Sequence, residues 1–327
     1  MTSTQAKPDQ LPEPLGFPGG GLFVRVGRPD REAALGCLLG ATGRRSAAGQ
    51  VGRFLAMSEE RGIRLDLMWA RHDATGEIAG VVLAVPSPGR TAMLFSSPPR
   101  SRADVEAQAP LIDHACRSLA DENVQLAQVL LDPADRLARD AFVAGGLHDL
   151  ALLGYMERAV PARGQAAAPT WPDGVTATRY TDADEAALRE VLTASYVATL
   201  DCPGLRGLRH TDDILAGHRA TGEFDPDLWT LLRDGDRPIG ALLLNPSAAT
   251  HTVELVYIGL AQPSRNTGLG RLLLRHGLRL IAGRSESTIT LAVDESNAPA
   301  VRLYRREGFR RALRRRALIR PIRRAND

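Results

Sequence analysis

The chain has 327 residues, enough for two domains, and its hydrophobic content of 44% and charged content of 24% are ordinary for a soluble globular protein. Its net charge of +3 is too small to indicate a nucleic-acid-binding surface, and no apolar run is long enough to span a membrane. The three cysteines lie far apart, which favours a reducing cytoplasm, and the seven histidines show no ligand spacing, so we predict no metal site.

The chain begins with a polar, proline-rich segment, which predicts a disordered leader over residues 1–20 and not a signal peptide. A segment rich in Pro, Ala and Gly lies at 158–174 and is typical of a linker. We therefore expect one domain over 21–160, a linker over 161–173 and a second domain over 174–327.

The two expected domains resemble each other in sequence. Three segments of the first recur in the second at offsets of 160 to 162 residues. The matched pairs are "GVVLAVPS" (80–87) with "GALLLNPS" (240–247), "LIDHACRSL" (111–119) with "LLRHGLRLI" (273–281), and "LDPADRLARDAFVAGGL" (131–147) with "VDESNAPAVRLYRREGF" (293–309). Two tandem copies of one structural unit are the simplest explanation.

Within the second copy, apolar periodicity and turn residues predict an alternation of helices and strands. The expected elements are helices at 182–198 and 211–219, strands at 228–233, 238–245 and 252–260, a helix headed by Gly268 and Gly270, a strand at 288–293, a helix from about 298 and a final arginine-rich strand. This order predicts an α/β (α+β) fold with a mixed sheet.

The helix headed by Gly268 and Gly270 begins in an unusual way. A helix start carries unpaired N–H groups and partial positive charge, so it normally has Asp or Glu in its first turn. Residues 264–275 contain no acid and three arginines. This composition favours a bound anion, such as a phosphate, at the helix start.

Two motifs in this copy resemble those of the GNAT acetyltransferases. "IGLAQPSRNTGLG" (258–270) is similar to the family's pyrophosphate-binding motif, with Arg265, Gly268 and Gly270 at its defining positions, and "NAPAVRLYRREGF" (297–309) is similar to its second signature. The resemblance covers about the C-terminal half of the chain. It implies two tandem GNAT-like domains and direct transfer of an acetyl group from acetyl-CoA, a co-substrate, to a primary amine in a ternary complex.

The resemblance also implies which residues hold acetyl-CoA. Backbone groups near the end of the strand would pair with the pantetheine arm, and Leu260 N–H would stabilise the oxyanion. Amides of the glycine-rich turn would bind the pyrophosphate, while Asn297 would contact the pantetheine or cap the following helix. The full set of expected contacts is Ile258, Gly259, Leu260, Arg265, Asn266, Thr267, Gly268, Leu269, Gly270, Arg271 and Asn297.

Two side chains are the candidates for proton transfer. Glu254 shares a predicted strand face with Val256 and Ile258, and a partly buried glutamate would have a raised pKa suited to a general base. Tyr304 would protonate the departing thiolate. The alternatives are an exposed edge-strand glutamate and a tyrosine that only packs on the sheet. Cys202 is expected to be a structural cysteine.

The first copy lacks these groups. At matched positions the pairs are Glu254 with Ala92, Arg265 with Ala103, Gly268 with Glu106, Gly270 with Gln108, and Tyr304 with Phe142. We therefore expect this copy to be non-catalytic and to shape the acceptor cleft. A small-molecule acceptor, without nucleic-acid or membrane partners, is favoured, and the oligomeric state stays unknown. Two alternatives remain open, a non-catalytic acyl-CoA-binding regulator and a protein N-acetyltransferase.

Overall fold

The computed structural model describes residues 23–40 and 44–322, so the leader expected over 1–20 lies outside the described residues. The chain forms two compact units that do not coincide with the two sequence copies. The smaller unit takes the residues up to Val85, with Leu94–Ser118 and Asp140–Gly146. The larger takes Pro86–Met93, Leu119–Arg139 and the residues from Leu147 onward.

The smaller unit is built on three antiparallel strands, and its apolar core includes the fully buried residues Leu35, Met68 and Leu83. Its strands are β1 (Phe23–Arg25), β2 (Met68–His72) and β3 (Ile78–Ser87). The helices α1 (Arg31–Leu38), α2 (Arg44–Glu60), α3 (Arg102–Ser118) and most of α4 (Arg136–Ala144) belong to it.

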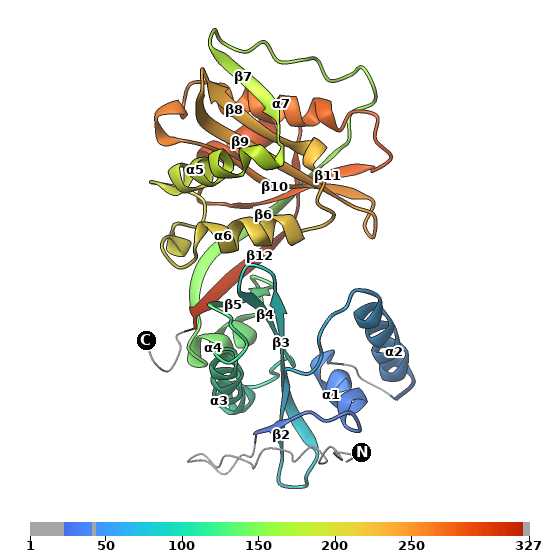
Figure 1. The fold of residues 1–327 in the computed structure, drawn as a ribbon. Coiled ribbons are helices and arrows are strands. Elements are labelled where there is room, and N and C mark those ends of the chain that lie inside the picture. The colour runs from blue at the N-terminus through green and yellow to red at the C-terminus, as the bar shows by residue number, and fades with distance from the viewer. Residues whose placement is uncertain (1–22, 41–43, 323–327) are drawn as a thin grey trace, which may run out of the picture. The chain divides into compact units, whose positions relative to one another are not determined.

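The larger unit contains a mixed sheet with the strand order β5-β12-β6-β11-β10-β9-β8-β7. These strands are β5 (Leu126–Leu131), β6 (His148–Ala159), β7 (Val175–Arg179), β8 (Trp229–Asp234), β9 (Arg237–Ser247), β10 (Thr252–Leu260), β11 (Thr288–Asp294) and β12 (Arg310–Pro321). The first residues of β4 (Thr91–Ser96) pair in parallel with β5. Figure 1 shows β12 running beside β6.

Helices cover both faces of this sheet. The helices α7 (Leu269–Leu280) and α8 (Ala298–Arg306) bury their apolar side chains against Val253 and Leu291 on one face. On the other face, α5 (Glu185–Tyr196) and α6 (Thr211–Ala220) pack against Trp229 and Leu243. The elements expected in the second copy are thereby confirmed, with boundaries shifted by a few residues and a short 3-10 turn before α5.

Amphipathic spacing explains why α7 lies where it does. Leu269, Leu273 and Leu278 are buried, whereas Arg271 and Arg275 between them are exposed. A Cβ atom at Gly277 would lie 2.8 Å from a methyl group of Leu242, so glycine allows the helix to approach β9 closely.

The internal repeat is confirmed, and the structure adds an exchange of strands between the copies. β12 lies between β5 and β6, and β6 pairs with β11, so each copy's last strand completes the other copy's sheet. Val160 N–H donates to Ser287 O at 3.0 Å and Ile322 N–H donates to Gln125 O at 2.8 Å. These two bonds are equivalent, because both donors and both acceptors are 162 residues apart (322 − 160 and 287 − 125).

Candidate active site

The two strands at the centre of the expected site separate after Glu254. Thr252–Glu254 of β10 pair in parallel with Thr288–Thr290 of β11. The later residues of these two described strands do not pair with each other. β10 nevertheless continues to Leu260 along its other neighbour, β9. A gap therefore opens between the C-terminal parts of β10 and β11.

A β-bulge corrects the expected orientation of β10. The register with β9 shifts between Leu255 and Tyr257, so Val256 and Tyr257 both pack on the α5 side, and Ile258 packs on the α7 side. Glu254 thus shares its face with Val256 but not with Ile258, contrary to the simple alternation. Burial raises the pKa of Glu254, the direction that favours a role as general base.

The backbone of Leu260 is oriented toward the gap. Ala261 N–H donates to Ile239 O of β9 at 2.8 Å. Successive residues of an antiparallel strand direct their N–H groups to opposite sides, so the N–H of Leu260 points away from β9 and toward the side of β11. A backbone donor facing this gap is suited to an oxyanion formed there.

The turn before α7 forms a cradle of unpaired N–H groups. Asn266 and Gly268 adopt left-handed φ angles of 62° and 88°. The backbone N–H groups of residues 266–270, all of them described, donate no hydrogen bond within the protein. A Cβ atom at Gly270 would make only ordinary contacts, near 3.8 Å, so the packing does not require glycine there. This arrangement fits the diphosphate of a nucleotide cofactor such as coenzyme A.

The arginines of this segment are already engaged by the protein. Arg265 donates to the backbone oxygens of Ser195, Ala198 and Leu260 at 2.6–3.1 Å, so its side chain fastens the cradle to the end of α5. Arg271 and Arg275 both bind the buried carboxylate of Glu307, at 2.5 Å and 3.0 Å. Glu307, which follows α8 directly, thus pairs with these arginines and leaves the N–H groups of the helix start without an acceptor.

Tyr304 lies on the face of the sheet opposite Glu254. Its side chain is buried in the cluster that contains Val253 and Leu255, and burial together with the charge of Asp201 raises its pKa, so the phenol is protonated at neutral pH. Proton acceptor and donor candidates therefore flank the gap from opposite faces. Asn297 caps α8 by accepting from Ala300 N–H at 3.3 Å.

A pair of aspartates that sequence reasoning missed joins the α5–α6 loop to the end of β11. Asp294 N–H donates to Asp201 Oδ1 at 2.9 Å, and Cys202 N–H donates to Asp294 Oδ2 at 3.3 Å. Burial and these two carboxylates raise the pKa of Cys202 to about 12, which keeps it a neutral thiol. No sequence motif marks Asp201 or Asp294, because their pairing depends on a contact across 93 residues.

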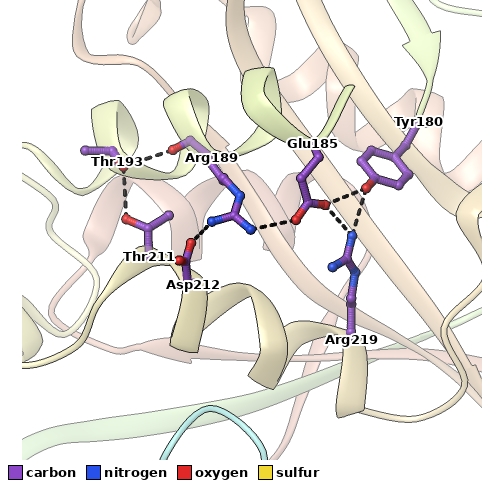
Figure 2. Close-up of polar contacts among 7 residues, drawn as sticks. All are labelled: Tyr180, Glu185, Arg189, Thr193, Thr211, Asp212 and Arg219. Carbon is purple, nitrogen blue, oxygen red and sulfur yellow. Dashed lines mark hydrogen bonds and ion pairs between the residues drawn. The ribbon is translucent and has the colours of Figure 1, made fainter. Parts of the chain in front are cut away.

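A polar network connects α5 with α6 on either side of this loop (Figure 2). Glu185 accepts from Tyr180 and Arg189 at 2.8 Å and also binds Arg219. Partial burial opposes ionisation of Glu185, but the hydrogen bonds from Arg219, Arg189 and Tyr180 outweigh it and lower the pKa to about 2. Arg189 also binds Asp212 of α6. The network holds α5 and α6, and therefore the two helices that the loop connects, against each other.

In the first copy the equivalent helix begins differently. α3 starts at Arg102, and Asp104 accepts from Arg100 N–H at 2.8 Å, so an acid of the protein itself occupies this helix start. Gln108, which matches Gly270, is buried and donates to Ser97 O at 2.7 Å. Glu106, the other acid expected to repel an anion at this helix start, is exposed.

The strand register corrects one matched pair. Gln128 and Thr290 are equivalent residues, 162 positions apart (290 − 128). Gln128 pairs with Met93 and Thr290 pairs with Glu254, so Met93, and not Ala92, lies at the position of Glu254. The cause is one additional residue in the turn before β10.

Comparison with known proteins identifies the class. Residues 193–309 match the model of the acetyltransferase (GNAT) family. The chain is similar, with 32% identity, to a mycothiol acetyltransferase of Streptomyces bingchenggensis over 43% of this chain and 44% of that protein. A second mycothiol acetyltransferase, from Nocardioides, is 29% identical over 43% of this chain and 52% of its own length. The chain thus spans about half the length of the curated relatives it matches.

Solved structures extend the likeness in fold to the whole chain. A GCN5-related N-acetyltransferase from Sphaerobacter thermophilus matches 94% of this chain and 98% of its own with a TM-score of 0.60 at 20% identity. A tandem GNAT protein from the clavulanic acid biosynthesis pathway matches 92% of this chain and 98% of its own with a TM-score of 0.51 at 17% identity. Residues 193–309 are therefore a GNAT domain, and the fold of the chain is that of tandem GNAT proteins. Among the described residues, no helix is long and apolar enough to cross a membrane.

Proposed function

We propose that the second copy transfers an acetyl group from acetyl-CoA to a primary amine of a small molecule in the cytoplasm. The observation that supports this most is the run of unpaired N–H groups over residues 266–270, beside the gap that opens after Glu254. Mycothiol acetyltransferases among the relatives support a small-molecule acceptor.

In this mechanism, the cradle binds the pyrophosphate, and the backbone of residues 258–260 and Asn297 hold the pantetheine arm. Glu254 takes a proton from the ammonium group of the acceptor, directly or through water, which frees the lone pair of the nitrogen. The nitrogen attacks the thioester carbonyl carbon while Leu260 N–H stabilises the developing oxyanion. The C–S bond then breaks, Tyr304 gives its proton to the departing thiolate, and the second proton that the nitrogen loses on becoming an amide restores the phenol.

The proposal assigns a supporting role to the first copy. The capped helix start at Asp104 and the filled position of Gln108 argue against a second acetyl-CoA site there. We accordingly propose one cofactor site per chain and a scaffold role for this copy.

Calorimetry with acetyl-CoA on the full chain, followed by an acetylation screen of primary amines, tests the proposal. Gly270→Asp should weaken acetyl-CoA binding by at least about tenfold, because its carboxylate repels the pyrophosphate at the helix start. Ala249→Asp adds the same charge on the exposed turn before β10 and should leave the affinity unchanged. Equal affinity of both variants would contradict the cradle, and binding without turnover of any amine would contradict the enzymatic role.

A further inference from the structure

One interior strand of the larger sheet, β11, has an exposed position on the face that carries Glu254. Toward α7, the β11 residues Ile289, Leu291 and Val293 are at most 2% exposed. On the opposite face, Ala292 is exposed, at a level where β11 still pairs with β6 but has separated from β10. A small, exposed residue at such a position leaves room for a ligand beside Glu254.

The next strand places a tyrosine on the same open face. Tyr155 of β6 pairs with Ala292, and its neighbour Met156 points to the opposite face, into the core beneath α7. Paired neighbouring strands lie about 4.8 Å apart, so β6 is about 10 Å from β10 at the level of Glu254. Glu254 is level with Thr290 and Glu157, and Ala292 and Tyr155 lie two residues further along the strands on the same face.

The electrostatics are consistent with this proximity. Burial raises the pKa of Tyr155, the charge of Glu254 raises it further, and Arg315 of β12 lowers it less than these two raise it. The phenol is therefore neutral at physiological pH and can both donate and accept a hydrogen bond.

Tyr155 comes from the first copy, through the strand exchange. Its equivalent in the second copy is Ala317 of β12, 162 residues later (317 − 155), which is buried. The phenol is thus present at only one of the two equivalent positions. It lies on β6, which pairs with β11 of the second copy, the copy that has the cradle. This asymmetry matches the single site proposed above.

We propose that Tyr155 determines acceptor specificity by hydrogen bonding to a hydroxyl group of a hydroxylated primary amine that lies across Ala292 with its nitrogen at Glu254. This face carries two further polar groups, the hydroxyl of Thr290 and the exposed carboxylate of Glu157, which are paired residues of β11 and β6. Both can form hydrogen bonds with the hydroxyl groups of such an amine. The inference rests on the proposed acetyltransferase function, and it adds the substrate class and a residue that selects it.

Acetylation of glucosamine and of cyclohexylamine by the full chain tests the inference, since both are six-membered-ring primary amines and one of them carries hydroxyl groups. The wild type should prefer glucosamine in kcat/KM. Tyr155→Phe should lower kcat/KM for glucosamine about tenfold, the effect of losing one hydrogen bond, and leave cyclohexylamine within about twofold. Ala292→Leu should raise the KM of both amines, with acetyl-CoA affinity unchanged by calorimetry. Ala249→Leu, the same substitution on the exposed turn before β10, is the matched control.

The outcomes separate this inference from the proposed function. Failure of the wild-type protein to bind acetyl-CoA would contradict the proposed function itself. Binding of acetyl-CoA without acetylation of glucosamine would overturn the substrate class. Equal losses on both amines in Tyr155→Phe, or an unchanged KM in Ala292→Leu, would overturn the role of this face.

Discussion

The helix starts at Arg102 and Leu269 open equivalent helices of the two copies, and they differ in one physical respect. The first is closed by its own residues, because Asp104 accepts a backbone N–H and Gln108 fills the space above the strand. The second helix begins only after a turn that contains two left-handed residues, and the N–H groups of this turn have no acceptor within the protein. Packing alone therefore does not require an open helix start, and its presence in one copy supports the acetyl-CoA site proposed there.

The largest expected effect follows from the strand exchange, which implies that neither copy folds without the other. Deletion of residues 1–160 removes β6, which lies between β11 and β12, so the remaining protein should expose two strand edges and an apolar face and aggregate without activity. A fragment that starts at Leu147 keeps β6 and should be more soluble. Size-exclusion chromatography with activity assays compares them, and a soluble, fully active 161–327 fragment would show that the copies are separable.

The chemical difference between the copies is tested at Glu254 and Tyr304. Glu254→Gln should lower turnover by about 10²-fold at neutral pH and recover partly at high pH, where the amine has already lost its proton. Tyr304→Phe should lower turnover with little change in acetyl-CoA affinity, since it acts on the leaving group. Steady-state pH–rate profiles and calorimetry measure both effects. A profile of Glu254→Gln parallel to the wild type would exclude the base.

A reverse substitution in the first copy sharpens the same comparison. Gln108→Gly copies the glycine of the cradle but leaves Asp104 at the helix start and removes the bonds to Ser97. We expect a stability loss of about 1–3 kcal/mol from the unpaired buried groups and no second acetyl-CoA site. Urea unfolding and calorimetric stoichiometry are the measurements, and a stoichiometry of two would show that the first copy lost its site through this residue.

The smallest expected effect concerns the network on the α5 side of the second copy. Because the folded state lowers the pKa of Glu185 to about 2, its ionised form stabilises the protein above its ordinary pKa, and this contribution disappears as the pH falls toward 2. Glu185→Gln should cost about 1–2 kcal/mol at pH 7, allowing for solvent screening, and almost nothing near pH 2. Urea titrations of both proteins across this range provide the test. A difference independent of pH would indicate lost packing.

The sequence predicted the local structure well and the long-range contacts poorly. Apolar periodicity located the elements of the second copy, and the 162-residue offset located the repeat. Pairing partners were not predictable, because β6 and β12 are equivalent segments of the two copies and either could pair with β5. The bulge at Val256 was not predicted either. The binding of Arg265 to the carbonyls of Ser195 and Ala198 and the contact of Glu307 with Arg271 depend on residues distant in the chain.

The position of β12 between β5 and β6 also has a consequence for synthesis on the ribosome. The sheet of the N-terminal half cannot close until residues 310–321 have left the exit tunnel. Two open strand edges are exposed to other nascent chains during that time. Folding of this protein is therefore expected to be largely post-translational, with chaperones needed to shield the waiting strands.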